Sequence, residues 1–179
     1  VFLSGHGRRN PRDGSYQFLP YDADPAHLNR TTVDDSQLKK FLGTIAGKTV
    51  LFLDTCHSGN LMSGQKGDTQ PDTDRLANEL AEADTGVIVF ASSTGKQISK
   101  EDAKWGNGAF TSALIEGIEG QADYTKDWHV SIAELEVWIP AQVKKLTEGN
   151  QTPVTAKPKA MEDLKVFYVI QEKKGEGKE

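Results

Sequence analysis

Cysteine is nearly absent from this chain: Cys56 is the only one in 179 residues. A single cysteine excludes an internal disulfide framework and any zinc site built from several thiolates, and it is typical of a reducing compartment such as the cytoplasm. Long apolar runs are also lacking, since none approaches the roughly 20 residues of a membrane helix. Acidic residues outnumber basic ones, and the net charge of -5 argues against a general nucleic-acid binder. We therefore expect neither a membrane nor a nucleic acid as a partner.

The length and the hydrophobic content of 36% are ordinary for one globular domain with a sizeable core. Four segments are predicted to be strands, at residues 1–4, 49–54, 86–92 and 165–170. The middle two contain "TVLFLD" and "GVIVFAS", which are nearly continuous apolar runs. Such runs are typical of strands buried on both faces of a parallel sheet.

Amphipathic helical patterns alternate with these strands, at residues 34–47, 72–83, 108–120 and 131–147. In the first pattern, Asp34 or Asp35 can cap the start of the helix and Gly47 can end it. The last pattern has Pro140 in its interior, so a kink or break is expected there. Strands that alternate with helices indicate an α/β fold with helices layered on a sheet.

The ends of the chain and one loop differ in composition from the rest. The chain begins with "VFLS", which is typical of a buried strand entered partway, so we interpret it as a fragment or a processed product. Residues 60–71, "NLMSGQKGDTQP", are polar and glycine-rich and are expected to form a mobile loop. The charged tail at 171–179 has no apolar residue and is predicted to be disordered. One domain is therefore expected over residues 1–170.

Cys56 follows a predicted buried strand, within "DTCHSG". Ligands of open α/β sheets collect at the C-terminal ends of the strands, so chemistry is expected at this position. His6, in "SGHG", also follows a predicted strand, and two parallel neighbouring strands would bring it to the same edge as Cys56. A nucleophilic thiol needs such a base. The backbone amides of Gly7 and Cys56 are candidates for an oxyanion hole.

Other roles for this cysteine stay open when only the residues are considered. A lone cysteine is more often a small buried hydrophobe than a nucleophile. His57 is nearer to Cys56 in sequence than His6 is, but adjacent side chains usually point apart. The presence of two glycine-flanked motifs at two strand ends favours a nucleophile that is paired with His6.

Together these motifs resemble the caspase-like cysteine peptidases, and most closely their bacterial and metacaspase-type branch. "VFLSGHG" precedes "LFLDTCHSG" by 50 positions, which is about the distance from histidine to cysteine in caspases. The segments "YQFLPYDAD", "GVIVFASSTG", "WGNGAFTSALIEG" and "QTPVTAKP" match the bacterial pattern in the same order. The resemblance runs from residue 1 to about residue 170.

The resemblance implies a caspase-like α/β/α sandwich with a mostly parallel central sheet. It assigns His6 as the general base and acid, and Cys56 as the nucleophile. The implied reaction is hydrolysis of a peptide bond in a protein or peptide substrate through a thioester acyl-enzyme, with no cofactor required for the chemistry. The family fold has strands before the histidine strand that are absent here. An upstream segment or a second chain is therefore expected to cover the open apolar edge of that strand.

Asp54 bears on substrate specificity, because caspases proper have glutamine at the position two before the nucleophile. The metacaspase-like branch has aspartate there and cleaves after Arg or Lys, and a carboxylate pairs with such a side chain and repels an acidic one. By resemblance Ser4 lines the same pocket. Ser92 and Ser93 follow the third predicted strand and are candidate contacts for the substrate backbone. The alternatives are that Asp54 only caps a turn after the strand, or that cleavage follows Asp as in caspases.

Self-processing is a further hypothesis, because caspase-like enzymes are often cut in the linker that follows the cysteine motif. Lys66 and Arg75 are basic residues in or next to that linker. Either would suit a pocket that accepts a basic side chain.

Calcium is a candidate activator, since metacaspase-like enzymes often depend on it through aspartates downstream of the histidine. Asp22, Asp34 and Asp35 match that pattern, and carboxylate oxygens are ligands that calcium prefers. The alternative is that Asp34 and Asp35 cap the following helix and that Asp22 belongs to a turn.

A second calcium-like pattern lies in "DYTKDWHVSIAE". Four of its residues fall at EF-hand ligand positions, namely Asp123, Thr125, Asp127 and Glu134. The glycine that the EF-hand loop requires is replaced by Trp128. "SIAE" is also a capping box that starts a helix, and this interpretation explains the residues more simply.

Two further classes of function compete with the peptidase. One is a catalytically silent caspase-fold module used for protein interaction, although such a module has no need of both His6 and Cys56. The other is a redox sensor centred on Cys56, which the lack of a resolving cysteine disfavours.

Overall fold

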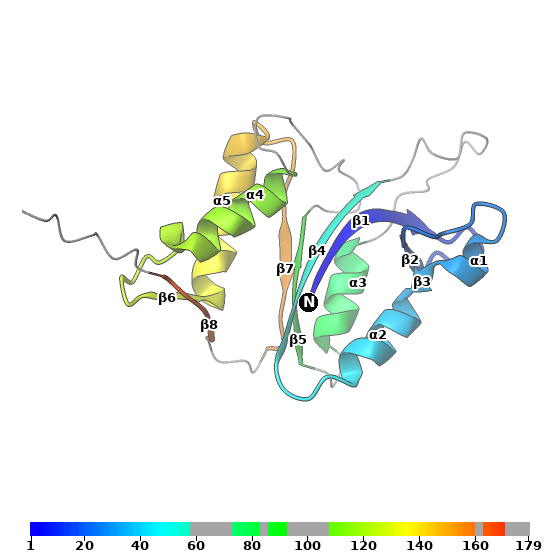
Figure 1. The fold of residues 1–179 in the computed structure, drawn as a ribbon, viewed down its shortest axis with the longest axis horizontal. Coiled ribbons are helices and arrows are strands. Elements are labelled where there is room, and N and C mark those ends of the chain that lie inside the picture. Colours follow the sequence, from blue (N-terminus) through cyan, green and yellow to red (C-terminus); the bar gives the residue numbers. More distant parts are fainter. Residues whose placement is uncertain (58–72, 83–85, 93–107, 160–162, 171–179) are drawn as a thin grey trace, which may run out of the picture.

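Figure 1 shows the fold in a computed structural model, which describes residues 1–57, 73–82, 86–92, 108–159 and 163–170. A six-stranded sheet in the order β3-β2-β1-β4-β5-β7 forms its centre. The strands are β1 (Phe2–Arg9), β2 (Tyr16–Leu19), β3 (Val33–Asp34), β4 (Thr49–His57), β5 (Val87–Ala91) and β7 (Val154–Ala156). β4 is parallel to both β1 and β5, whereas β2 is antiparallel to β1 and β3, and β7 is antiparallel to β5. The predicted α/β fold with a mostly parallel central sheet is confirmed.

Helices cover both faces of this sheet (Figure 1). They are α1 (Leu28–Thr31), α2 (Asp35–Gly43), α3 (Thr73–Glu82), α4 (Ala109–Glu116), the π-helical turn η1 (Gly117–Gln121) and α5 (Ile132–Leu146). Successive strand residues point to opposite faces, so the apolar run of β4 serves two cores. Leu51 and Leu53 pack with residues of α2 and α3, whereas Phe52 packs with Phe90, α4 and α5. None of the described helices has both the length and the apolar character that a membrane crossing needs.

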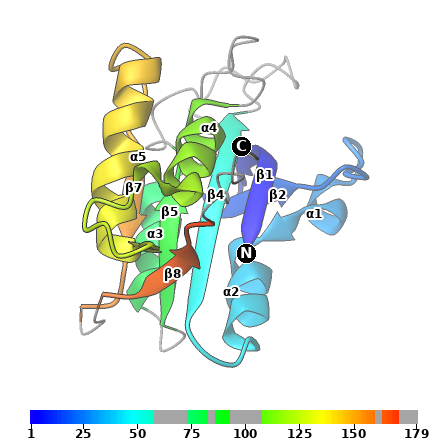
Figure 2. The same ribbon diagram turned by 60° about the vertical axis from the view of Figure 1, so that its left-hand side comes forward.

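The last predicted strand forms, as β8 (Lys165–Tyr168), but it does not join the central sheet. β8 pairs antiparallel with β6 (His129–Ser131) in a separate two-stranded sheet. Figure 1 shows this pair beside α4 and α5, and Figure 2 shows β8 outside the plane of the six strands. Val166 and Phe167 of β8 pack against the core that α4 and α5 share, so β8 completes a helical layer rather than the sheet.

The chain does not break at Pro140, because α5 continues through this residue from Ile132 to Leu146, and a kink there stays a prediction. A proline inside a helix removes one hydrogen bond and costs about 3 kcal/mol. Ile139 and Val143 lie on either side of Pro140 and are fully buried in the core. Their burial, at roughly 1.5–3 kcal/mol for each side chain, offsets the cost of the proline.

β2 occupies one side of β1, which the sequence pattern did not predict. Its pairing covers His6 to Arg9 of β1, and in the described part of the chain residues 2–5 of β1 pair only with β4. Phe2 at this end is 46% exposed. Completion of the sheet by an upstream segment or a second chain stays a prediction. The loop predicted at 60–71 and the tail predicted at 171–179 lie outside the described residues.

Candidate active site

The two motifs of the sequence lie side by side in the central sheet. β1 and β4 are parallel neighbours, and their register places His6 opposite Cys56 and Ser4 opposite Asp54. Backbones of paired strands are about 4.8 Å apart. Both strands run further than the sequence predicted, to Arg9 and His57, so His6 and Cys56 lie within the strands rather than after them.

Strand alternation divides these residues between the two faces of the sheet. Phe52 packs against α4 and α5, and Thr111 of α4 contacts Asp54, so the described even-numbered positions of β4 belong to that face. Ser4 is opposite Asp54, and His6 follows it by two residues, so His6 shares this face, and its side chain is exposed. In the ladder, the backbone of His6 lies opposite that of Cys56.

Gly5 and Gly7 flank His6, and each has an aromatic ring of β2 against it. A Cβ at Gly7 would lie 2.9 Å from Cε2 of Tyr16, and one at Gly5 would lie 3.2 Å from Cε2 of Phe18. Gly5 also has a φ of +152°, a value that residues with side chains rarely adopt. The glycines thus allow close packing with β2, on the face opposite His6. Gly7 lies between Phe18 of β2 and His57 of β4 in the ladder, and its role in an oxyanion hole stays a prediction.

Asp54 lies two positions before Cys56 in β4 and is buried, with 7% of its surface exposed. The hydroxyl Oγ1 of Thr111, in α4, donates a hydrogen bond to Oδ2 of Asp54 at 2.5 Å. Asp54 lies within β4, which continues to His57. Its carboxylate lies on the face of His6, and its role in substrate binding stays a prediction.

Tyr16 and Thr111 support this site, and sequence reasoning missed both. Tyr16 packs against Gly7 and is 2% exposed, and burial raises the pKa of its hydroxyl, so it stays neutral. Thr111 holds Asp54 from α4. Their sequence signals are weak, because a tyrosine at a strand start and a threonine in a helix are both common. Tyr16 gains its role because β2 pairs with β1, and Thr111 gains its role because α4 packs on β4.

Ser92 lies at the end of β5 and is 2% exposed. Its backbone N–H donates to the carbonyl of Leu53 at 2.9 Å, and its carbonyl accepts from Nε2 of Gln151 at 2.7 Å. These bonds fix the end of β5 beside β4. A contact of Ser92 with substrate stays a prediction. Ser93 and Lys66 lie outside the described residues.

The aspartates proposed for calcium do not come together as a site. Asp34 caps α2, where its side chain accepts from the backbone N–H of Gln37 in a capping box. Asp35 is 3.5 Å from the guanidinium of Arg75, and Asp22 is exposed in a different turn. Among the described residues, no three His, Cys, Asp or Glu side chains are grouped as a metal site would require. The interpretation of Asp34 as a helix cap is confirmed, and calcium activation stays a prediction without a described ligand set.

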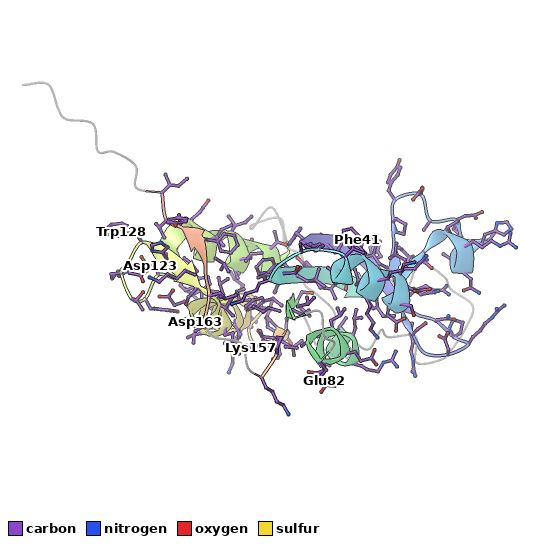
Figure 3. The ribbon with its side chains drawn as sticks, turned by 90° about the horizontal axis from the view of Figure 1, so that it is seen from below. Phe41, Glu82, Asp123, Trp128, Lys157 and Asp163 are labelled. Carbon is purple, nitrogen blue, oxygen red and sulfur yellow. The ribbon has the colours of Figure 1, made fainter. Side chains whose placement is uncertain are left out.

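The EF-hand-like segment is a hydrogen-bonded loop. Asp123 accepts from the backbone N–H groups of Asp127 and Trp128, and Glu134 accepts from those of Thr125 and Ser131. The carboxylate oxygens of this segment are thus already hydrogen-bonded within the chain. The capping box predicted at the start of α5 is confirmed. Figure 3 shows Asp123 and Trp128 together at one end of the molecule, far from Phe41 of α2.

Comparison with known families agrees with this geometry. A family model described as a caspase domain, of the type Peptidase_C14, matches residues 1–164. The match includes both glycine-flanked motifs and the helices on both faces of the sheet. A search of curated proteins gives no match.

Proposed function

Because the chain belongs to the caspase-domain family of cysteine peptidases, we propose that it is an active endopeptidase that uses a His6–Cys56 dyad. The observation that carries this proposal is the register of β1 and β4, which sets His6 opposite Cys56 in neighbouring parallel strands. His6 is exposed there, as a group that exchanges protons with a substrate must be. A silent interaction module gives no reason for an exposed histidine to be opposite the only cysteine.

The proposed reaction follows from these two groups. Sγ of Cys56 attacks the carbonyl carbon of the scissile bond as its proton passes to the imidazole of His6. The tetrahedral intermediate carries an oxyanion, for which the amides of Gly7 and Cys56 are the proposed donors. His6 returns the proton to the leaving amine as the C–N bond breaks, which leaves a thioester. Water, deprotonated by His6, then attacks the thioester and releases the acid and the free thiol.

Asp54 supports a preference for Arg or Lys on the acyl side of the cleaved bond. Its carboxylate is buried two positions before Cys56 on the same face, and Ser4 lies opposite it on β1. A carboxylate held at low exposure pairs strongly with a guanidinium or ammonium group and disfavours an acidic side chain. Cleavage after Asp, as in caspases, would place two carboxylates together.

Cleavage of fluorogenic peptides ending in Arg, Lys, Asp or Leu, with and without calcium, tests this proposal. We expect Arg and Lys peptides to be cut, and Cys56→Ala to abolish the signal. Asp54→Asn should lower kcat/KM for the Arg peptide by about 10- to 100-fold, because it removes a charged hydrogen-bond partner. Thr111→Val is the matched control, since it removes the hydrogen bond to Asp54 but keeps the carboxylate. Cleavage of Asp peptides would keep the nucleophile and overturn the role of Asp54.

Self-processing is proposed after Lys66 rather than Arg75. Arg75 lies in the first turn of α3 and contacts Asp35 and Glu79 through its guanidinium at 3.5 and 3.6 Å. A peptidase needs an extended segment, so cleavage after Arg75 would require that turn to unwind. Mass spectrometry of the purified chain should show fragments that end at Lys66 and that are absent from Cys56→Ala. An intact chain after long incubation, in a preparation that cuts peptides, would refute self-processing.

A further inference from the structure

A surface pocket beside β1 is lined by basic side chains. Its volume is about 490 Å³, and it lies between the β1–β2 turn and the segment that contains α1. Arg8, Arg12, Arg30 and His27 are among the residues that line it. Arg8 comes from β1, Arg12 from the turn, and the other two from the α1 segment. Three parts of the chain thus bring positive charge to one place.

This charge is not balanced by acidic groups in the described part of the chain. The residues that line the pocket include no aspartate or glutamate. His27 is bonded to Asp24, with 2.7 Å between Nδ1 and Oδ2, but no described carboxylate lies within ion-pair distance of the three arginines. A cluster of unpaired arginines is unusual in a chain with a net charge of -5. It is the arrangement expected where a separate anion binds.

Arg8 is the arginine of this cluster whose side chain is fixed by a hydrogen bond. It is half-buried, and its Nε donates to Oε1 of Gln17, a neutral acceptor, at 2.8 Å. Burial lowers the pKa of Arg8, since a cation loses hydration there without a carboxylate to replace it. The guanidinium still has donors beyond Nε, in a fork that matches the two oxygens of a carboxylate.

The pocket lies on the face of the candidate active site. Arg8 is two residues after His6 in β1, so the two share a face by strand alternation and are about 7 Å apart along the strand. Gln17, which Arg8 contacts, is opposite it on β2. A peptide bound across His6 would therefore extend within one or two residues of Arg8.

We propose that the pocket lined by Arg8, Arg12 and Arg30 binds an acidic side chain of the peptide substrate, near the bond that is cut. This proposal rests on the proposed peptidase function and adds a second specificity element to it. Asp54 would accept the basic residue before the cleaved bond, and the arginine pocket would accept an acidic residue at another position. A carboxylate that meets two or more guanidinium groups forms short, charge-assisted hydrogen bonds. The net negative charge of the whole chain disfavours a polyanion such as nucleic acid as the occupant.

Binding of labelled peptides to the Cys56→Ala chain tests the pocket without any need for catalysis. Rhodamine-labelled peptides would contain one Arg, with Glu or Gln at each flanking position in turn, and fluorescence anisotropy would give Kd. We expect Glu at one position to tighten binding by about tenfold over Gln, and less at high ionic strength. Arg12→Gln combined with Arg30→Gln should reduce that ratio to near one. Lys40→Gln, on the exposed side of α2, is the matched control and should leave the ratio unchanged.

Three other outcomes separate the possible failures. If no position shows a preference for Glu while Arg peptides are cut by the unmodified chain, the pocket proposal is overturned and the peptidase stands. If Glu tightens binding but no peptide is cut, the pocket stands and the proposed catalysis fails. If inorganic phosphate binds in an Arg12-dependent manner and Glu gives no preference, the pocket takes a free anion, which overturns the proposal.

Discussion

At the scale of single residues, Gly7 shows how the site depends on close packing. It follows His6 directly, and Tyr16 of β2 fills the space where a side chain would lie. The glycine-flanked motif predicts a role for the Gly7 amide, and the structure adds an aromatic neighbour on the face opposite His6. A glycine is thus required at this position even before substrate binds.

Gly7→Ala is predicted to destabilise the fold. Its Cβ would lie 2.9 Å from Cε2 and 3.2 Å from the hydroxyl of Tyr16, which is almost fully buried and has little room to move. Overpacking of this kind costs about 1–3 kcal/mol. Urea unfolding would measure the change in the free energy of unfolding. Tyr16→Leu combined with Gly7→Ala should cost less than the sum of the single changes, and strict additivity would contradict the clash.

At the scale of elements, the long buried strands were predictable, whereas most of the short strands were not. β4 and β5 contain continuous apolar runs, and both were predicted from sequence. β2, β6 and β7 have three or four residues each, too few for a periodic pattern, and their pairing depends on distant segments. Pairing between distant segments also explains why β1 and β4 run past their predicted ends. Their hydrogen bonds to each other extend both strands over His6 and Cys56. The motif placement was therefore predictable, but the support from β2 and α4 was not.

The loop before α5 is an element whose stability is predicted to depend on pH. Burial favours a higher pKa for Glu134, but hydrogen bonds from Ser131 and Thr125 outweigh it and leave the pKa lowered. A carboxyl with a lowered folded pKa contributes stability above its unfolded pKa of about 4.3, and that contribution is lost as pH falls through the folded pKa. Glu134→Gln should therefore cost about 1 kcal/mol at pH 7 and almost nothing at low pH.

Chemical unfolding of the unmodified chain and of Glu134→Gln, between about pH 3 and pH 7, would measure the difference between their free energies of unfolding. Glu136→Gln is the matched control on the same helix, because the ion pair of Glu136 with Lys157 lies at the surface. Such a pair contributes roughly 0–1 kcal/mol. A pH-independent cost of Glu134→Gln would contradict the role of its ionised form.

At the scale of the whole molecule, two hydrophobic cores hold the sheet from both sides and leave one end of one face for chemistry. α2 and α3 cover one face, and α4 and α5 cover the other, where they reach Phe52 and Asp54 of β4. β1 lies further from these helices, so Ser4 and His6 stay exposed. The result is a buried carboxylate on one side of the proposed dyad and a cluster of arginines on the other. The order of the strands in the sheet, rather than any single motif, places the negative and the positive groups on opposite sides.

The activation of Cys56 by His6 is the central claim, and the rate of alkylation by iodoacetamide measures it most directly. Cys56 is the only cysteine, so every adduct seen by mass spectrometry reports on it. A base that raises the thiolate fraction speeds alkylation, and His6→Ala should slow it by about tenfold at pH 7. His129→Gln, in β6, is the control and should leave the rate unchanged. Equal rates for the unmodified chain and His6→Ala would contradict the dyad.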